Sequence, residues 1–401
     1  MILLNSKKYD FLIIGAGIVG LSVAKELTEK FPTATIAIIE KEKEIGMHAS
    51  GRNSGILHSG IYYPEDSLKA KVCAEGARRM MDFAGEHKIA CKKIGKIIIP
   101  TCQQQLPALD ILLKNAANNH IKAYQLDENE IKKIEPYANV FQYGIHTPDT
   151  ASIDSKAILK KLSAIIVSRK VDLYLNHELL SASEKINEIL TSKDKFHFDY
   201  LFNCAGAGTD KIAKMFGLAK DYTLLPFKGI YYKLTPQKNH WVNGNIYPVP
   251  DLTLPFLGVH FSRSINGDVY VGPTAIPAFG QENYGLLKGM SADAFRIVKD
   301  ILSMYWANQQ NFRKLMHTEM KKNIKHYFIK NAQQLISSIT THDLLTSNKV
   351  GIRPQLINIR KRKIEMDYII EQTPCSLHVL NAISPAFTSA LCFAELLVNK
   401  I

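Results

Sequence analysis

The chain has 401 residues, of which 46% are hydrophobic and 22% charged, and its formal net charge is +13. This composition is typical of a globular protein of about two domains and excludes a disordered chain. No stretch approaches the roughly 20 apolar residues of a membrane-spanning helix, and residues 1–9 have too short an apolar run for a secretory signal. The cysteines are scattered without a CxxC pair, so we expect a protein of the reducing cytoplasm with no disulfide framework and no metal site.

The N-terminal segment has the pattern of a dinucleotide-binding unit. Tyr9–Ile14 is apolar enough for a buried strand of a parallel sheet, residues 21–29 have the apolar spacing of a helix, and Thr35–Glu40 predicts a second strand. Between the first strand and the helix lies GAGIVG, residues 15–20. A lone GxGxxG is a weak signal, but here the strand–helix–strand context that the motif requires is present.

Each glycine of this motif has a mechanical role. Gly15 permits a tight turn, Gly17 lets the backbone approach a pyrophosphate, and Gly20 lets the helix lie close to the sheet. Ile18 and Val19 open the helix, whose N-terminal amide groups attract phosphate.

The end of the second predicted strand bears on the nucleotide. Glu40 stands twenty residues after Gly20, where its carboxylate can accept both hydroxyl groups of an adenosine ribose and repels a 2′-phosphate. Lys41 follows directly and is a further candidate for contact with the cofactor. The βαβ unit alone leaves NAD and FAD open.

A later segment predicts a return to the nucleotide domain. A strand at 197–205 runs into Gly206-Ala207-Gly208 and a helix at 209–216. A discontinuous nucleotide domain favours FAD over NAD, because an extended flavin needs more wall than one βαβ unit supplies.

The other elements complete two domains. Up to residue 233 we expect helices at 67–87, 103–118, 127–134 and 155–168, and strands at 93–100, 171–176 and 227–233. A hairpin of 257–261 and 268–271, turned at Asn266-Gly267, follows. The rest is a mainly helical, Lys- and Asn-rich region at 292–338, strands at 366–370 and 377–380, and a helix at 385–398. They predict an α/β (α+β) protein. Its Rossmann-like domain occupies residues 1–88, 148–225 and 346–401, and a substrate domain on a mixed or antiparallel sheet occupies 89–147 and 226–345.

Several motifs, in order along the whole chain, resemble one family. They are GAGIVG, HASGRNSGILHSGIYYPEDSLKAKVC (48–73), GVHFSRSINGDVYVGPTA (258–275), VGIRPQL (350–356) and LHVLNAISPAFTSAL (377–391). This set resembles the L-2-hydroxyglutarate oxidases and dehydrogenases of the FAD-dependent D-amino-acid-oxidase-like superfamily. The resemblance implies FAD as cofactor and oxidation of L-2-hydroxyglutarate to 2-oxoglutarate, with hydride transfer from C2 to flavin N5 and electrons passed to O₂ or a quinone.

The resemblance also assigns residues to the cofactor. Residues 51–63, GRNSGILHSGIYY, combine apolar and hydrogen-bonding groups, as a segment beside a flat flavin with a polar rim requires. The candidates are His48, which could attach flavin covalently, Ser50, Gly51, Asn53, Ser54, Gly55 and Leu57, then Leu179 at the adenine, Asn203, Cys204, Ala205 and Gly206 at the pyrophosphate, and Ser384, Pro385 and Ala386 at the pyrimidine end of the ring.

The reaction needs a base for the hydroxyl proton and cations for two carboxylates. His58 and His260 are the candidate bases, because an imidazole is mostly neutral at pH 7; His260 could instead bind a carboxylate. The resemblance assigns one carboxylate to Arg353, whose guanidinium gives two parallel hydrogen bonds. Lys228 stands where we expect Arg in the family and is the candidate for the second carboxylate, and the Tyr62 hydroxyl can hydrogen-bond the substrate.

Other interpretations stay open at this point. The substrate could be glycerol 3-phosphate, a secondary amine or an amino acid, and a non-catalytic alternative is a basic, nucleotide-binding protein of the membrane surface. The net charge, the run Arg360–Lys363 and the helix at 385–398 fit peripheral attachment to the anionic inner face of the cytoplasmic membrane, where a quinone could accept electrons. No nucleic-acid motif accompanies the basic run, so no nucleic-acid partner is expected, and no oligomeric state is predicted.

Overall fold

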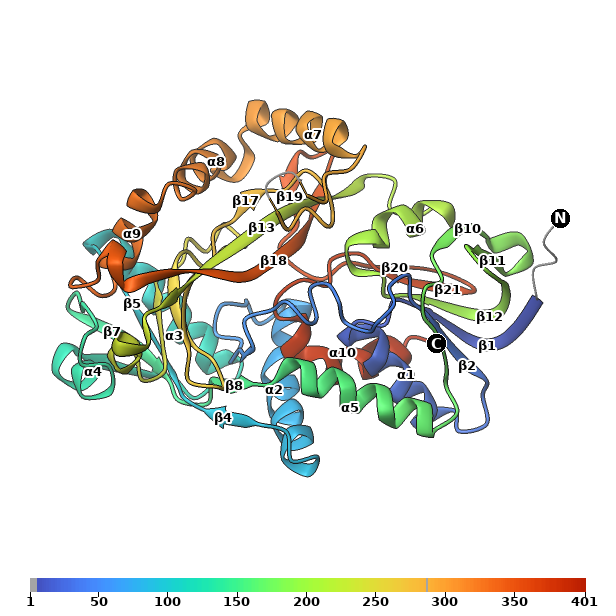
Figure 1. Cartoon of the computed structure of the whole chain (residues 1–401), viewed down its shortest axis with the longest axis horizontal. Helices are drawn as coiled ribbons and strands as arrows, with labels where there is room; N and C mark the ends of the chain where they lie inside the picture. The colour runs from blue at the N-terminus through green and yellow to red at the C-terminus, as the bar shows by residue number, and fades with distance from the viewer. Residues whose placement is uncertain (1–5, 286–287) are drawn as a thin grey trace.

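Two large sheets lie side by side in the computed structural model, which describes residues 6–285 and 288–401. The first sheet is on the right of Figure 1 and the second on the left. Residues 1–5, which belong to the segment expected to lack a secretory signal, lie outside the described residues. The predicted class, α/β with a Rossmann-like domain and a second domain on a mixed sheet, is confirmed.

The first sheet has a parallel centre in the order β12-β1-β2-β9. β21 runs parallel to the last residues of β12, and β20 pairs with β21, whereas β10 and β11 form an antiparallel extension along the start of β12. The strands are β1 (Ser6–Ile14), β2 (Ile36–Ile39), β9 (Asp172–Tyr174), β10 (Leu179–Ser183), β11 (Glu188–Thr191), β12 (Lys195–Asn203), β20 (Ile370–Thr373) and β21 (Ser376–Val379).

Helices cover both faces of this sheet. One core contains residues of α1 (Ile18–Lys30), α2 (Leu68–Glu86), α5 (Ser155–Ser168) and α10 (Ala386–Val398). The opposite face is covered by α6 (Thr209–Met215). Because α10 packs against α1 and α2 and is buried along most of its length, the prediction that this helix serves membrane attachment is wrong.

The second sheet is mixed, in the order β19-β18-β13-β16-β15-β14-β5-β7-β6, with β17 beside β13. Only the β14–β5 pair is parallel among the pairs described. The strands are β5 (Lys96–Ile99), β6 (Tyr124–Asp127), β7 (Tyr143–Thr147), β13 (Tyr222–Leu234), β14 (Asn245–Pro248), β15 (His260–Arg263), β16 (Val269–Gly272), β17 (Ile276–Pro277), β18 (Leu344–Asn358) and β19 (Lys363–Ile364). The β15–β16 pair confirms the predicted hairpin.

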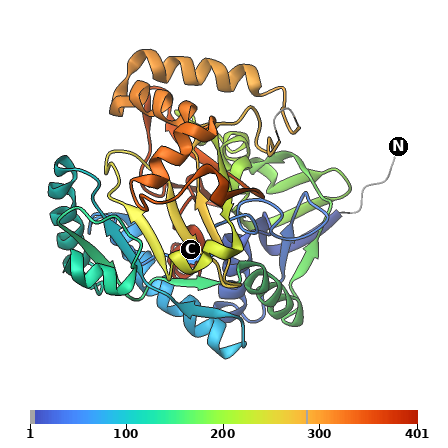
Figure 2. The same cartoon turned by 60° about the vertical axis from the view of Figure 1, so that its left-hand side comes forward.

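Smaller elements join the two sheets or lie on their surfaces. A three-stranded sheet consists of β3 (Ile56–Leu57), β8 (Ala151–Ile153) and β4 (Cys91–Lys93). The second sheet carries α3 (Leu106–Asn118), α4 (Glu128–Ile134), α7 (Ala294–Ala307), α8 (Phe312–Lys321) and α9 (Lys325–Gln333). The predicted helical region at 292–338 consists of α7, α8 and α9, with η5 between the first two. In Figures 1 and 2 these helices lie together on the outer side of β13 and β18. The 3-10 turns are η1 (Gln103–Gln105), η2 (Glu184–Ile186), η3 (Gly206–Gly208), η4 (Pro236–Trp241), η5 (Gln309–Asn311) and η6 (Thr341–Asp343).

Two expected boundaries differ from the structure. β18 belongs to the second sheet, although residues 346–401 were expected in the nucleotide domain. The strand expected at 366–370 begins only at Ile370. Its earlier residues serve α2 instead, because the Asp367 carboxylate accepts the amide hydrogens of Leu68 and Lys69 at 2.7 and 3.0 Å.

Candidate active site

The β1–α1 turn has no room for side chains. Gly15 has φ +102°, and a Cβ there would lie 2.6 Å from the carbonyl oxygen of Cys204. A Cβ on Gly20 would lie 2.0 Å from the carbonyl oxygen of Gly15. The turn therefore keeps an open backbone surface where β1 and β12 end side by side, which is where nucleotide phosphates bind in this type of sheet.

Polar contacts hold the surroundings of this turn. The Ile18 amide at the start of α1 donates to the Ser50 hydroxyl at 2.9 Å. The Glu40 carboxylate, which is 9% exposed, accepts the amide hydrogens of Ala16 and Glu42 at 2.8 and 3.0 Å. These bonds place the Glu40 carboxylate beside the turn, and its contact with a ribose stays a prediction.

The segment after β12 reaches the same turn. The Cys204 amide donates to the carbonyl of Ile14 at 2.9 Å, and the Cα of Ala205 is 3.1 Å from the Cβ that Gly15 lacks. The side chain of Asn203 is fully buried and donates to the carbonyl of Thr209 at 3.0 Å. The Asn203 side chain thus joins the two ends of the loop that contains Cys204, Ala205 and Gly206.

Residues 50–63 form an irregular segment that its own polar side chains hold. Asn53 donates to the carbonyl of Ser50 at 2.6 Å and accepts the Gly55 amide at 2.8 Å. The Ser54 hydroxyl accepts the amide of Ile56 at 3.3 Å. Gly51 lies against the carbonyl of Gly46, where a Cβ would stand 2.3 Å away, Gly55 has φ +77°, and Leu57 is fully buried.

β18 crosses this segment from the second domain. Lys349 donates to the carbonyl of Ser54 at 3.1 Å, and a Cβ on Gly351 would lie 2.8 Å from the carbonyl oxygen of Arg52. Alternate residues of a strand share a face, so Arg353 points to the same side as these two residues. The structure therefore brings Arg353 to residues 50–63.

A buried row of side chains faces His58 and Tyr62. It consists of Lys96 on β5, Tyr247 on β14 and His260 on β15, which are neighbouring strands. The rings of Tyr247 and His260 are stacked with centroids 3.8 Å apart. The Lys96 ammonium lies 4.4 Å from the centroid of the Tyr62 ring.

The pKa values of His58 and His260 respond to the same neighbouring charges. Burial, together with the charges of Lys96 and Arg353, lowers the pKa of His58 to about 3. Burial likewise lowers the pKa of His260 to about 3, with smaller contributions from His58, Arg353 and Lys96. Both imidazoles are therefore neutral at pH 7 and can accept a proton.

Three polar atoms of this cluster have no hydrogen-bond partner among the described residues. They are His58 Nδ1, the Tyr62 hydroxyl and Lys96 Nζ, and all three are buried. Buried polar atoms without partners are rare in proteins and are explained where a ligand completes them. The predicted catalytic residues thus meet at a place suited to a small polar ligand.

The structure does not bring Lys228 into this cluster. In the β13–β18 ladder Phe227 lies opposite Arg353 and Lys228 opposite Ile352, so Lys228 and Arg353 point to opposite faces of the sheet. The Lys228 ammonium donates to the carbonyl of Gly285 at 2.7 Å. The expectation that Lys228 holds the second carboxylate beside Arg353 is contradicted by this placement.

His48 lies in a separate polar cluster. Its Nδ1 is 2.9 Å from the Tyr284 hydroxyl and its Nε2 is 2.9 Å from the Glu42 carboxylate. The Lys41 ammonium donates to both Glu42 and Glu282. Lys41 therefore supplies the positive charge in this acidic group, and the cofactor contacts expected of Lys41 and His48 stay predictions.

The other expected cofactor residues are positioned by secondary structure. Leu179 starts β10, and Pro385 is the residue before the first turn of α10. The Ala386 amide donates to the carbonyl of Ile383 at 2.8 Å. α10 is tied to residues 50–63 by the His58 amide, which donates to the Thr388 hydroxyl at 3.1 Å. Ser384–Ala386 thus lie beside this segment through α10, and their contact with flavin stays a prediction.

These features fit FAD. The glycine turn offers an open backbone surface for the pyrophosphate, and an irregular segment leads from it to unpartnered polar atoms. Gly15–Gly20, Glu40 and residues 50–57 would hold the cofactor, which supplies a two-electron acceptor when bound.

Comparison with known proteins agrees with this geometry. A family model described as "FAD dependent oxidoreductase" matches residues 10–400. The chain belongs to this family of FAD dependent oxidoreductases. Its cofactor is therefore FAD, and the non-catalytic alternative is set aside.

Among known proteins, this oxidoreductase is similar to L-2-hydroxyglutarate dehydrogenases over nearly its whole length. It is 33% identical to the mitochondrial L-2-hydroxyglutarate dehydrogenase of Caenorhabditis briggsae over 98% of this chain and 93% of the relative. It is 34% identical to the L-2-hydroxyglutarate dehydrogenase of Indibacter alkaliphilus over 96% of both chains. The resemblance to L-2-hydroxyglutarate oxidases and dehydrogenases is thus confirmed.

A solved structure shares the fold. The dithionite-reduced, FAD-bound L-alpha-glycerophosphate oxidase of Mycoplasma pneumoniae superposes with a TM-score of 0.75 at 22% identity, covering 98% of this chain and 94% of that chain. At this identity the likeness establishes the fold alone, and the substrate has to be inferred from the residues of the site.

Two residues of the oxidoreductase's site escaped the sequence-based prediction. Tyr247 lies in an ordinary apolar strand, and no local signal marks it. Lys96 had a signal, because it is a single lysine between Gly95 and three isoleucines at the start of a buried strand. A charged residue in such a strand is rarely buried without a reason.

Proposed function

We propose that this oxidoreductase converts L-2-hydroxyglutarate to 2-oxoglutarate. The observation that carries the proposal is that two histidines, half-buried His58 and buried His260, meet two basic side chains, half-buried Arg353 and buried Lys96. His58 and His260 offer proton acceptors, and Arg353 and Lys96 offer positive charge within electrostatic range of both rings. Oxidation of a 2-hydroxy dicarboxylate needs a proton acceptor and positive charge for its carboxylates. The relatives named above are L-2-hydroxyglutarate dehydrogenases.

The hydrogen bonds of His260 prepare it for this role. Its Nδ1 lies 2.9 Å from the carbonyl of Gly258, and because a carbonyl only accepts, Nδ1 carries the proton. In the neutral ring Nε2 is then free to accept a proton. His58 is the second candidate, and its Nδ1 is free of partners among the described residues.

Arg353 is suited to the carboxylate next to the reacting carbon. One guanidinium nitrogen donates to the carbonyl of Pro255 at 3.2 Å, and the group lies 5.2 Å from the centroid of the Phe256 ring. This bond and the ring orient the guanidinium plane, which can bind a carboxylate through two parallel hydrogen bonds. Binding there would hold C2 and its hydroxyl near the histidines.

Flavin bleaching tests the reaction directly. The FAD-loaded protein is mixed under anaerobic conditions with L-2-hydroxyglutarate, D-2-hydroxyglutarate, glycerol 3-phosphate or sarcosine, and the flavin absorbance is followed. We expect rapid bleaching only with the L-hydroxy acid. Bleaching by glycerol 3-phosphate or sarcosine alone would assign the site to one of the alternative substrates.

We further infer that the outer helices dock on an anionic membrane, which would bring the enzyme to a quinone acceptor. No helix among the described residues is long and apolar enough to cross a membrane. However, α7 exposes an apolar stripe at helical spacing: Phe295 is 88% exposed and Trp306 is 71% exposed, with Val298 and Leu302 between them. Such a stripe on an amphipathic helix suits the interfacial region of a bilayer.

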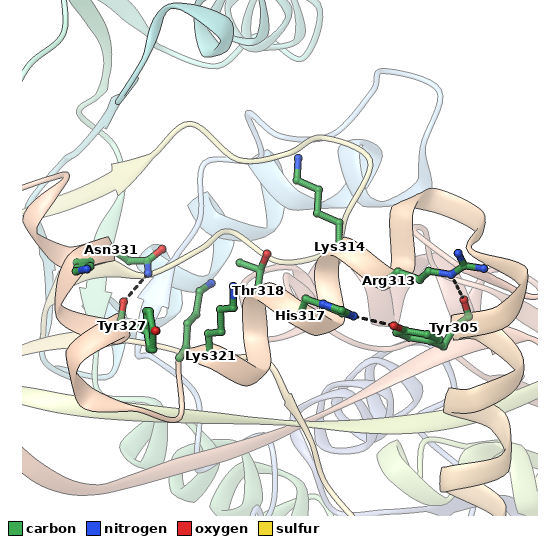
Figure 3. A pocket seen from close by; sticks show the side chains of 10 residues that line it. Tyr305, Arg313, Lys314, His317, Thr318, Lys321, Tyr327 and Asn331 are labelled. Carbon is green, nitrogen blue, oxygen red and sulfur yellow. Dashed lines mark hydrogen bonds between the residues drawn. The ribbon is translucent and has the colours of Figure 1, made fainter.

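Cations lie directly beside this stripe. A hollow of about 470 Å³ between α7, α8 and α9 is lined by the exposed cations Arg313, Lys314, Lys321 and Lys330, among others. Figure 3 shows these helices around the hollow, with Tyr305 of α7 bonded to His317. Lipid phosphate groups match this charge, and the net charge of +13 adds long-range attraction.

Vesicle flotation tests the membrane proposal. We expect the protein to float with anionic vesicles at low salt and not with zwitterionic ones, and the double variant Phe295→Ser, Trp306→Ser to stay in solution. Ile186→Ser is the matched control, since Ile186 is 60% exposed on the first domain. Equal flotation of the double variant and the control would contradict the inference.

A further inference from the structure

Lys96 is a buried cation without a counter-ion. Its side chain is 1% exposed, and Nζ has no hydrogen-bond partner in the part of the chain that the structure describes. The Lys96 ammonium lies 4.4 Å from the centroid of the Tyr62 ring and 5.4 Å from that of the Tyr247 ring. Ring contacts compensate an ammonium group only in part.

The surroundings of Lys96 make the protein without substrate less stable. Burial lowers the pKa of Lys96 to about 7, and the charge of Lys96 acts on both His58 and His260 together with that of Arg353. With this pKa the ammonium of Lys96 is only about half protonated at pH 7, and a bound anion would favour its charged form. A purely structural lysine would be paired, as Lys322 is with Glu319 at 2.5 Å.

Arg353 and Lys96 approach His58 and His260 from different strands, so each can meet a separate carboxylate. Arg353 enters the site from β18, whereas Lys96 enters from β5, on the far side of β13, β16, β15 and β14 in the sheet order. The unpartnered Tyr62 hydroxyl can donate to the same anion as Lys96. Lys228, the earlier candidate for a second cation, points to the other face of its strand pair.

We propose that Lys96 binds the C5 carboxylate of the substrate, with help from Tyr62, and thereby selects a dicarboxylate over a monocarboxylate. This rests on the proposed oxidation of L-2-hydroxyglutarate with its C1 carboxylate at Arg353. Lys96 is a specificity-determining residue in this assignment, remote from the bond that is oxidised.

A pair of substrates isolates this role. L-2-hydroxypentanoate has the same chain length as L-2-hydroxyglutarate, with a methyl group in place of the C5 carboxylate. In Lys96→Met we expect kcat/KM for the dicarboxylate to fall by roughly 100-fold or more, and that for the monocarboxylate to stay or rise. An equal loss with both substrates would overturn the proposal, because a general structural defect acts on both.

Lys228→Met is the comparison variant. It removes the same charge from a residue of similar burial on the opposite face, and we expect it to preserve the ratio of the two kcat/KM values. A collapse of this ratio in Lys228→Met, with the ratio intact in Lys96→Met, would assign the C5 carboxylate to Lys228.

Binding without turnover supplies a second readout. Glutarate has no hydroxyl group to oxidise, so its Kd for the FAD-loaded protein reports carboxylate binding alone. We expect Lys96→Met and Lys96→Gln to weaken glutarate binding while both variants melt at or above the wild-type Tm without ligand. A lower Tm with unchanged glutarate affinity would show a structural role and overturn the proposal. If wild-type flavin is not bleached by L-2-hydroxyglutarate, the proposed function fails, whereas the glutarate comparison still reports on Lys96.

Discussion

The imidazole ring of His260 lies against the phenol ring of Tyr247, with centroids 3.8 Å apart and planes 16° apart. The Tyr247 hydroxyl lies 3.3 Å from the Ser262 hydroxyl. Because Ser262 is on β15 and Tyr247 is on β14, this contact holds the end of the Tyr247 side chain against the neighbouring strand. This stack and the bond to Gly258 fix the ring of His260 with Nε2 available.

Removal of the Tyr247 ring should therefore disturb His260. We expect Tyr247→Leu to lower kcat roughly 2- to 10-fold, the range that corresponds to the value of one aromatic pair. Tyr247→Phe keeps the stacked ring and should retain most activity. Steady-state kinetics with L-2-hydroxyglutarate measures both, and an equal loss in the two variants would attribute the effect to the hydroxyl group instead of the stack.

The pH dependence of kcat/KM should reflect the free enzyme. The pKa values of His58 and His260 are lowered to about 3, so the neutral, proton-accepting form persists below pH 6.5 and the profile should stay flat from pH 6.5 down to 5. An acidic limb centred near pH 6.5 would contradict the lowered pKa values of the two histidines.

The alkaline side of the same profile should depend on Lys96. Its charged form binds the carboxylate and declines as the pH rises through its pKa of about 7, which burial lowers and the Cys73 thiol slightly raises. Arg353 stays charged, since even a lowered pKa leaves guanidinium protonated. We expect kcat/KM for the dicarboxylate to fall above pH 7, and the fall to be absent for L-2-hydroxypentanoate; a shared fall would point to another group.

Arg353 should act on both substrates alike. The C1 carboxylate is common to L-2-hydroxyglutarate and L-2-hydroxypentanoate, so Arg353→Lys should lower kcat/KM for each by roughly 30-fold or more, because a lysine cannot reproduce the paired hydrogen bonds. Kinetics on the two substrates, compared with Lys96→Met, separates the two cations. If Arg353→Lys lowered kcat/KM for the dicarboxylate alone, Arg353 would bind the C5 carboxylate and Lys96 the C1 carboxylate.

The glycine turn should control FAD binding. Gly15→Ala places a Cβ 2.6 Å from the Cys204 carbonyl at φ +102°, so we expect the turn to shift and the protein to purify with little flavin. Gly208→Ala is the control, since its nearest neighbour is 3.9 Å away and φ is −99°. The ratio of flavin absorbance to protein absorbance measures the outcome, and full flavin content in Gly15→Ala would contradict it.

Local patterns were enough to predict two parts of the fold. The β1–GxGxxG–α1 unit and the hairpin at Asn266-Gly267 depend on glycine turns and on apolar spacing within about 20 residues, and both occur where the sequence predicts them. The motifs around His58, His260 and Arg353 likewise led to the family, because these side chains belong to short, characteristic stretches.

The sequence by itself thus determined the fold class and the cofactor, and it named His58, Tyr62, His260 and Arg353, whose roles stay predictions. Only the tertiary structure decided which lysine joins them, because the face on which a strand residue points depends on its register with distant partners. Lys96 faces Tyr62 after β5 pairs with β14, some 150 residues later in the chain, and Lys228 turns away because Phe227 is the residue opposite Arg353. The burial of α10 was decided in the same way, by packing against α1 and α2 that its own composition does not specify.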